Sequence, residues 1–338
     1  MNLIIPMAGS GKRMRPHTFT VPKPLIPIAG KPMVQHLVED ICAMSVHKIE
    51  QIGFVIGPNF GIDAEEHLLD IAKKAGAKGR IFYQEQALGT AHAALCAAPM
   101  LIDKVIIAFA DTLFRGKVII NEERDGTIWV QKVADPKAFG VVKLDNTNFI
   151  SDFIEKPAEF ISDLAIIGIY YVKNGGYLKN EMQNLVDSDL KEKGEYQLTN
   201  ALENMKRKGT KFTVAEVSEW LDCGNKDATI NTNRRMLETK PQNKIPQSAR
   251  LNNSIVIQPS YIGEHVKIDN SVVGPFVSIG PGTTVHHSII SDSIIQANCI
   301  INYANISGTM MGNNVQYTGS RHNLNLGDFS QIKDDNGN

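Results

Sequence analysis

The first segment with clear chemical potential is a short glycine-containing loop that ends in two cations. An apolar run at residues 3–5 leads into Ala8, Gly9, Ser10 and Gly11, which are followed by Lys12 and Arg13. A strand that runs into such a turn at a helix N-terminus presents backbone N–H groups to an anion. Arg13 adds a fixed charge and a fork of donors that suits phosphate oxygens. The loop therefore predicts a phosphate-binding site.

A third cation lies shortly after the loop. Lys23 stands between Pro22 and Pro24, which restrict its backbone. The loop is not a Walker P-loop, which needs Gly-Lys-Ser/Thr at its end, and it lacks the third glycine of a dinucleotide fingerprint. Because glycine-rich turns are common in α/β proteins, the combination of loop, Arg13 and Pro-Lys-Pro is more informative than the loop alone.

Two aspartates follow apolar segments. Asp111 ends the run KVIIAFAD, and Asp222 lies in WLDCG. A carboxylate after a buried strand stands at the carboxyl edge of a sheet, where ligands bind in open α/β folds. Either residue by itself would be interpreted as a turn or capping aspartate.

The elements that must position these residues alternate along the first two thirds of the chain. Short apolar runs predict strands, and longer amphipathic segments predict helices. The expected strands are 3–5, 51–56, 80–84, 104–109, 127–132, 140–144, 150–154 and 166–172. The expected helices are 33–44, 64–75, 89–97, 198–206 and 227–237. This alternation predicts an α/β fold with a Rossmann-like, mainly parallel sheet and helices on both faces.

The last third of the chain has a different pattern. From about residue 252, branched apolar residues recur every six positions, with small or polar residues between them. The recurring residues are Ile262 and Ile268; Val273, Ile279 and Val285; and Ile294, Ile300 and Ile306. If each six-residue repeat forms one face of a triangular coil, the pattern predicts a short left-handed parallel β-helix. Stacking of the coils then buries the apolar edge. A plain antiparallel sheet with chance spacing is the alternative.

These two patterns predict two domains in 338 residues. We expect a catalytic domain at 1–237, a linker at 238–250, a β-helix domain at 251–320 and a polar tail at 321–338. The exposed end and edge of a β-helix favour association with a partner, so a homo-oligomer is expected.

Composition and charge exclude several classes of protein. The formal net charge of -1 gives no support for binding to nucleic acid or to a membrane surface. The four cysteines are far apart and form no CxxC pair, which fits a reducing compartment rather than a disulfide framework or zinc site. No apolar run approaches the ~20 residues that span a bilayer, and no signal peptide is evident, so a cytoplasmic location is expected.

Several motifs occur in an order that identifies a family. They are GSGKRMRPHT with PKPLIPIAGKPM, QEQALGTAHA (84–93), FADTLF (109–114), IEKP (154–157), WLDCGN (220–225) and, more weakly, GEYQLTNAL (194–202). Together they closely resemble the sugar-1-phosphate nucleotidyltransferases, also called sugar-nucleotide pyrophosphorylases. The resemblance covers residues 1 to about 237, and a six-residue-repeat tail is a common appendage in this family.

The resemblance implies a nucleotide site with bound Mg²⁺. The loop and Arg13 would hold the triphosphate, Lys23 would lie beside the α-phosphate, and Asp111 and Asp222 would hold the metal, which prefers oxygen ligands. The implied nucleotide-binding set is Ala8, Gly9, Ser10, Gly11, Arg13, Lys23, Gln84, Gly89, Thr90 and Asp111.

The base and the sugar have their own motifs. Gln84 can donate to and accept from the imide edge of uracil or thymine, and Gly89 would let the backbone approach the base, so dTTP or UTP is expected. The residues expected to bind the sugar phosphate are Gly140, Glu155, Lys156 and Thr199. The implied catalytic residues are Arg13, Lys23, Asp111 and Lys156.

The sequence departs from the family pattern in two places. Ala110 stands where glycine is common, and Cys223 stands where threonine is frequent. Neither change removes a charged group. A nucleophilic role for Cys223 is rejected, since the reaction needs no covalent intermediate and no adjacent histidine is evident.

The implied reaction is NTP plus sugar 1-phosphate giving NDP-sugar and pyrophosphate, with glucose 1-phosphate as the expected sugar. Three alternatives stay open. The chain could be a guanylyltransferase acting on mannose or heptose 1-phosphate, or a catalytically inactive regulatory subunit. The tail could be an acyltransferase, with His286 and His287 as the obvious bases.

Overall fold

The computed structural model describes residues 1–116, 119–239 and 244–320. The chain forms two compact units, one from Met1 to Met236 and the other from Leu237 onward, and each is described by itself. The expected polar tail at 321–338 lies outside the described residues, as does part of the expected linker, 240–243.

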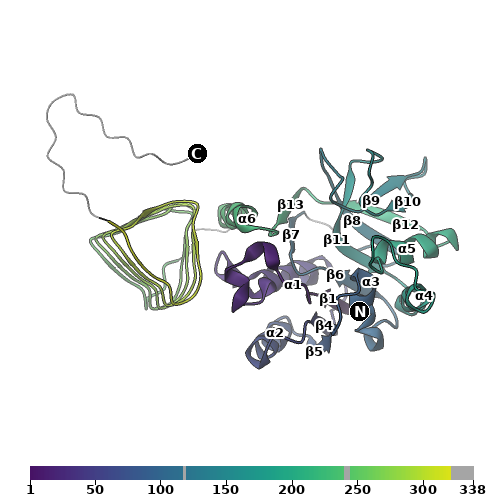
Figure 1. Ribbon diagram of the computed structural model, residues 1–338, viewed down its shortest axis with the longest axis horizontal. Helices are drawn as coiled ribbons and strands as arrows, with labels where there is room; N and C mark the ends of the chain where they lie inside the picture. Colours follow the sequence, from purple (N-terminus) through teal and green to yellow (C-terminus); the bar gives the residue numbers. More distant parts are fainter. Residues whose placement is uncertain (117–118, 240–243, 321–338) are drawn as a thin grey trace. The chain divides into compact units, whose positions relative to one another are not determined.

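The first unit is built on a mixed sheet whose centre is parallel (Figure 1). The parallel strands are β1 (Asn2–Pro6), β4 (Gln51–Ile56), β5 (Lys78–Tyr83) and β6 (Val105–Ala108), in the order β6-β1-β4-β5. All five residues of β1 and all four of β6 are buried, as apolar runs in a covered parallel sheet must be. The expected parallel α/β sheet is therefore confirmed.

Antiparallel strands extend this sheet beyond β6. The long strand β11 (Leu164–Val172) pairs with β6, with β8 (Gly126–Lys132) and with β9 (Val141–Leu144). Strand β10 (Ile150–Ile154) pairs antiparallel with β9, and β12 (Phe212–Glu216) pairs parallel with β8. This half of the sheet carries the predicted IEKP motif directly after β10.

Helices pack on the sheet in two groups (Figure 1). Helices α1 (Met33–Met44) and α2 (Ile62–Lys74) contact each other, while α3 (Thr90–Leu95), α4 (Gly175–Asp187) and α5 (Leu198–Arg207) form the second group. Helix α4 was not predicted, although Asn174 caps it by accepting the backbone N–H of Tyr177 at 2.9 Å. Helix α6 (Lys226–Thr239) follows, and no described helix is long and apolar enough to cross a membrane.

A separate two-stranded antiparallel sheet joins the two aspartate motifs. Strand β7 (Thr112–Arg115) pairs antiparallel with β13 (Glu219–Asp222), and Asp222 is the register partner of Thr112. Because Asp111 immediately precedes Thr112, this pairing brings the two aspartates to neighbouring backbone positions.

The second unit is a three-sided stack of parallel strands, consistent with the left-handed β-helix expected from the repeats (Figure 1). One face is β14 (Arg250–Asn252), β17 (Lys267–Asp269), β20 (Thr284–His286), β23 (Ile300–Asn302) and β26 (Gln316–Thr318). The second is β15 (Ile255–Val256), β18 (Val272–Val273), β21 (Ile289–Ile290) and β24 (Asn305–Ile306). The third is β16 (Tyr261–Ile262), β19 (Ser278–Ile279), β22 (Ile294–Ile295) and β25 (Met310–Met311).

The six-residue spacing was wrong for part of the last coils. Val285 pairs with Ile301, which is fully buried, whereas Ile300 is 41 % exposed. The cause is coil length. A hydrogen bond between neighbouring coils spans 17 residues from Ser271 to Ser288 but only 16 from Ser288 to Ala304. Three full six-residue repeats would need about 18 residues, so the inward positions drift from the predicted spacing.

Candidate active site

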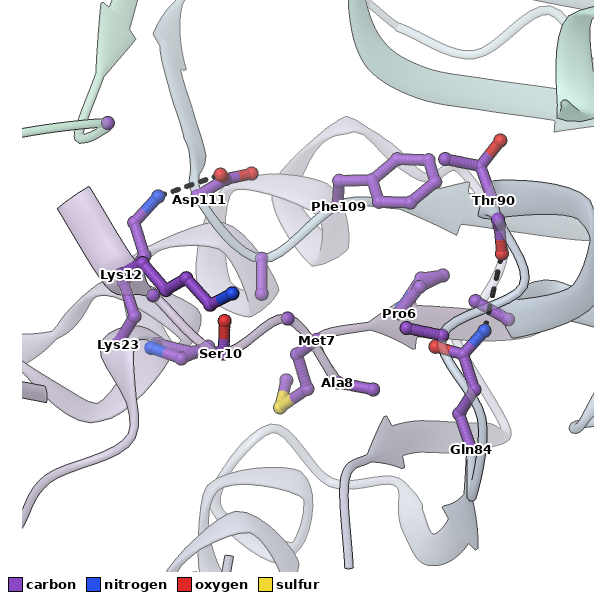
Figure 2. Close-up of a pocket in the computed structure, with 18 of the residues that line it drawn as sticks. Pro6, Met7, Ala8, Ser10, Lys12, Lys23, Gln84, Thr90, Phe109 and Asp111 are labelled. Carbon is purple, nitrogen blue, oxygen red and sulfur yellow. Dashed lines mark hydrogen bonds and ion pairs between the residues drawn. The ribbon is translucent and has the colours of Figure 1, made fainter. Parts of the chain in front are cut away.

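A cavity of about 480 Å³ opens at the carboxyl edge of the parallel strands. All ten residues expected to bind the nucleotide line it, and no other described pocket contains the set. Figure 2 shows Lys12, Lys23 and Asp111 at one side of the opening loop and Gln84 and Thr90 at the other. The cavity therefore has a cationic end and an end lined by neutral polar groups.

The opening loop differs from the expected helix N-terminus. Gly11 adopts φ +59°, and the chain continues as a 3-10 helix of three residues, Lys12–Met14. A turn this short has no substantial macrodipole, so the expected helix-end stabilisation of an anion is corrected. The loop still offers free hydrogen-bond donors to an anion. Within the described chain, the backbone N–H groups of residues 8–12 have no acceptor. With Lys12 and Arg13, they can still hold phosphate oxygens.

The third cation is paired with the first aspartate. Lys23 Nζ lies 2.8 Å from Asp111 Oδ2, and the lysine side chain is 10 % exposed. Lys23 follows Pro22 and begins a 3-10 helix, Lys23–Leu25. The ion pair places the ammonium group directly at the cavity edge. There a phosphate could replace the Asp111 carboxylate as the partner of Lys23, or bind Lys23 together with it.

Arg13 and Asp222 meet at Gly224. A Cβ on Gly224 would lie 2.7 Å from Asp222 Oδ2 and 3.4 Å from Arg13 Nη1. Gly224 lines the cavity, so the second aspartate stands beside it although Asp222 belongs to the next strand. The absence of a Cβ at Gly224 thus leaves room for both charged groups.

The two aspartates fit a Mg²⁺ ion whose remaining oxygen ligands would come from the substrate. Asp111 and Asp222 come from adjacent positions of the β7–β13 pairing, and each offers carboxylate oxygens. Across residues 1–116, 119–239 and 244–320, no cluster of three or more His, Cys, Asp or Glu could hold a metal by itself. Mg²⁺ is characteristically held by one or two carboxylates plus phosphate oxygens and waters, so two aspartates are sufficient.

At the neutral end, Gln84 is 7 % exposed and already partly bonded. Its Nε2 donates to the carbonyl oxygen of Gly89 at 3.3 Å and lies 3.1 Å from His92 Nδ1. Burial lowers the pKa of His92, which favours the neutral ring that can accept this bond. The Gln84 carbonyl oxygen is the group left for a ligand, rather than the donor and acceptor expected together.

Gly89 is required by the packing of the chain. It adopts φ +117°, and a Cβ there would lie 2.5 Å from the carbonyl oxygen of Tyr196 and 2.6 Å from its nitrogen. Thr90 lies next to it, and its Oγ1 accepts the backbone N–H of Leu198 at 2.9 Å. The segment that follows β5 is therefore fixed against the segment that begins α5.

The four residues expected to bind the sugar phosphate form one cluster. Thr199 Oγ1 donates to Glu155 Oε2 at 3.2 Å, and Lys156 Nζ lies 3.6 Å from Glu155 Oε1. A Cβ on Gly140 would lie 3.0 Å from Glu155 Oε2. The Glu155 side chain is only 10 % exposed, so its carboxylate is held in place before any ligand arrives. Such an arrangement can accept hydrogen bonds from hydroxyl groups.

Several cavity residues were not predicted as binding groups. These are Pro6, Met7, Lys12, Pro24, Ala87, Ala93, Phe109, Ala110, Glu195 and Gly224. Lys12 stood beside Arg13 in the loop, and Glu195 stood in the weaker motif, so both carried a signal. Gly224 stood in WLDCGN, but its place beside Arg13 and Asp222 is visible only in the structure.

Cys223 is fully buried beside this site, and burial raises the pKa of its thiol to about 12. The thiol is therefore protonated at neutral pH, in keeping with packing rather than nucleophilic chemistry. In the second unit, His286 Nδ1 lies 3.2 Å from Asp269, and His287 stacks on Tyr303 with ring centroids 5.1 Å apart.

Comparison with known proteins gives a consistent result. The pattern of the nucleotidyl transferase family matches residues 3–239. A glucose-1-phosphate thymidylyltransferase of Streptomyces antibioticus is 29 % identical, over 98 % of this chain and 99 % of the relative. The bifunctional protein GlmU of Methanococcus maripaludis strain C7 is 32 % identical, over 76 % of this chain and 60 % of the relative.

Solved structures agree on the fold. A putative glucose-1-phosphate thymidylyltransferase from Bacillus anthracis has a TM-score of 0.60 and 24 % identity, covering 72 % of this chain and 98 % of that one. A UDP-glucose pyrophosphorylase bound to UDP-glucose has a TM-score of 0.58 and 23 % identity, covering 71 % and 99 % of the two chains.

Proposed function

The chain belongs to the nucleotidyl transferase family, and we propose that it is a sugar-1-phosphate nucleotidyltransferase that uses dTTP or UTP. Glucose 1-phosphate is the proposed sugar substrate, and the products are NDP-glucose and pyrophosphate. The names of the similar proteins support this class, since they include thymidylyltransferases and a UDP-glucose pyrophosphorylase.

One observation carries the proposal. The glycine-containing loop and three cations line the same cavity as Gln84 and Gly89, and the chain continues from the cavity residue Glu195 to Thr199, which bonds to Glu155. This arrangement supports a nucleotide site together with a carboxylate that could bind the hydroxyl groups of a sugar. A protein that bound only a nucleotide would not need the second cluster.

The proposed mechanism is direct transfer. An oxygen of the sugar phosphate attacks the α-phosphorus in line, the bond to the β-phosphate oxygen breaks, and pyrophosphate leaves with that electron pair. Because the nucleophile is already an anion, no general base is required. The main barrier is electrostatic, since one anion must approach another.

The chain's own residues address that barrier. Arg13 and the loop N–H groups orient the triphosphate, Lys23 neutralises charge at the α-phosphate, and Lys156 does so at the sugar phosphate. Asp111 and Asp222 would hold Mg²⁺, which would supply further charge neutralisation. In this scheme Lys23 exchanges its Asp111 partner for phosphate when the nucleotide binds.

Base choice would depend on the neutral end of the cavity. The Gln84 carbonyl oxygen can accept the imide N–H of uracil or thymine, a proton that the ring edges of cytosine and adenine do not offer at that position. Leaving a buried amide unpaired costs ~1–3 kcal/mol, so uracil or thymine should be preferred over cytosine and adenine roughly tenfold to a hundredfold.

The test is a panel of four nucleoside triphosphates against several sugar 1-phosphates, with pyrophosphate release as the readout. We expect dTTP or UTP to exceed GTP and ATP, and Gln84→Ala to flatten the preference without changing the KM of the sugar. A clear preference for GTP would overturn the base assignment. Tight binding of Mg-nucleotide with no turnover on any sugar would instead identify an inactive regulatory protein.

A further inference from the structure

We propose that Tyr196 is a positioning residue for base recognition, because its backbone holds the loop that reads the nucleobase. This inference rests on the proposed function, since it concerns the same nucleotide cavity. The base loop is defined as residues 84–91. Tyr196 donates its backbone N–H to the carbonyl oxygen of Leu88 at 2.9 Å and accepts the N–H of Ala91 at 2.9 Å. The two bonds bracket Gly89.

The backbone of Tyr196 packs tightly against the base loop. The Cβ that Gly89 lacks would lie 2.5 Å from the Tyr196 carbonyl oxygen, so the two backbones are in direct contact. The carbonyl oxygen of Gly89 in turn accepts the Gln84 amide at 3.3 Å. A shift of Tyr196 therefore moves Gly89, and a shift of Gly89 turns the Gln84 amide whose free oxygen faces the ligand.

The side chain of Tyr196 fixes the position of its backbone. The residue is 5 % exposed, and its ring belongs to the main core of the first unit. Its hydroxyl donates to Asp189 Oδ1 at 2.6 Å, and Lys191 Nζ lies 2.6 Å from the same oxygen and 5.0 Å from the ring centroid. Hydrogen bonds from Lys191 and Tyr196 lower the pKa of Asp189, so the acceptor is ionised at neutral pH.

The substitution Tyr196→Phe isolates this effect, because it keeps the ring and removes the hydroxyl. The readout is the ratio of the dissociation constants of GTP and dTTP, measured by titration in the presence of Mg²⁺ and without a sugar. We expect the preference for dTTP to fall about threefold to tenfold, the range expected for one hydrogen bond.

Changes at Asp189 test the same contact from its other side. Asp189→Gly removes the acceptor and suits the backbone there, which has φ +49°. It should reduce the preference as much as Tyr196→Phe, and the double variant should lose no more than either single variant. Asp189→Asn keeps an acceptor oxygen and tolerates the same backbone, so it should retain most of the preference.

Tyr171→Phe is the matched control. Tyr171 is also buried and donates its hydroxyl to a carbonyl oxygen, that of Glu122 at 2.9 Å, and its strand pairs with β6 and β8 rather than with the base loop. It should lower the melting temperature and leave the GTP to dTTP ratio unchanged. If Tyr196→Phe behaves in the same way, its role is structural and the proposal fails.

The possible outcomes distinguish a failure of the positioning role of Tyr196 from a failure of the proposed reaction. A wild-type protein that binds GTP and dTTP equally overturns the positioning role. A preference in binding that falls in Tyr196→Phe supports it even if no pyrophosphate is ever released, a result that would refute only the proposed reaction.

Discussion

Adding one methyl group at Gly140 should damage sugar binding and nothing else. In Gly140→Ala the new Cβ lies 3.0 Å from Glu155 Oε2, closer than an ordinary contact. It cannot move away freely, because Ile166 Cδ1 and Thr199 Cγ2 lie at 3.4 and 3.5 Å from it. Gly140 is not among the glycines with positive φ, so the backbone itself accepts alanine. The Glu155 carboxylate must therefore shift.

The size of the effect follows from what that carboxylate does. Glu155 Oε2 also accepts the Thr199 hydroxyl at 3.2 Å, so a shift would break this hydrogen bond as well as the proposed contact with the sugar. One misaligned hydrogen bond to a charged group costs ~1.5–3 kcal/mol. That corresponds to a loss of roughly 10- to 150-fold in kcat/KM for the sugar 1-phosphate, with nucleotide binding unchanged.

Two other glycines provide comparators for this assay. At Gly9 no atom lies within 4 Å of an added Cβ, so Gly9→Ala should fold normally, place its methyl in the nucleotide cavity and weaken only nucleotide binding. Gly176 lies in the first turn of α4, with the nearest atom to its Cβ position at 3.4 Å, so Gly176→Ala should change neither substrate.

The measurements are the KM and kcat for the sugar 1-phosphate at saturating nucleotide, and the dissociation constant of the nucleotide alone. Equal losses of sugar and nucleotide affinity in Gly140→Ala would refute the reasoning, since they would indicate a general distortion. An unchanged KM for the sugar would remove Glu155 from the sugar site.

Three further predictions concern metal, thiol and acid. Asp111→Asn and Asp222→Asn should each abolish pyrophosphate release while the melting temperature stays within a few degrees; turnover restored by excess Mg²⁺ to the wild-type rate would argue against metal ligation. The native Cys223 thiol, whose pKa is about 12, should react with iodoacetamide at pH 8 only on unfolding, and rapid labelling of the native protein would contradict its burial. For Glu122, burial acts to raise the pKa but hydrogen bonds, first from Lys104, lower it more, so the net pKa is lowered. Its stabilisation is therefore present above the unfolded pKa of 4.5 and lost as pH falls through the lower folded value; Glu122→Gln should weaken the dependence of melting temperature on pH in this window, and identical acid profiles would contradict the assignment.

Much of the parallel sheet was predictable because β1 and β6 are short apolar runs in which every residue is buried, and β4 is buried at all but its first residue. Strand β4 and helix α1 have the bounds that the apolar pattern predicts. The short strands β7 and β13 were missed, since their significance depends on pairing with each other and not on local composition. In the β-helix, coils of 16 or 17 residues cannot keep a strict six-residue spacing, and Ile301 is buried where Ile300 was expected.

The candidate site also has one part that the sequence predicted and one part that it did not. Residues whose proposed roles depend on charge or on a missing side chain, such as Arg13, Lys23 and Gly140, could be nominated from motifs. Interactions between segments could not, because they depend on tertiary contacts. The Gln84 amide was expected to be free, yet its donor is used by Gly89 and His92. The contact of Tyr196 with the base loop is likewise a property of the fold.

The pairing of β7 with β13 has a consequence for the order in which the molecule becomes functional. Asp111 follows the central sheet early in the chain, while Asp222 arrives only at the end of the catalytic unit. Bringing such distant segments together is entropically costly and tends to occur late in folding. The proposed metal site would then be absent from partly synthesised or partly folded chains, however much of the nucleotide loop they had formed. Mg²⁺ affinity would consequently serve as a sensor of complete folding, and premature turnover on the ribosome would be prevented by topology alone.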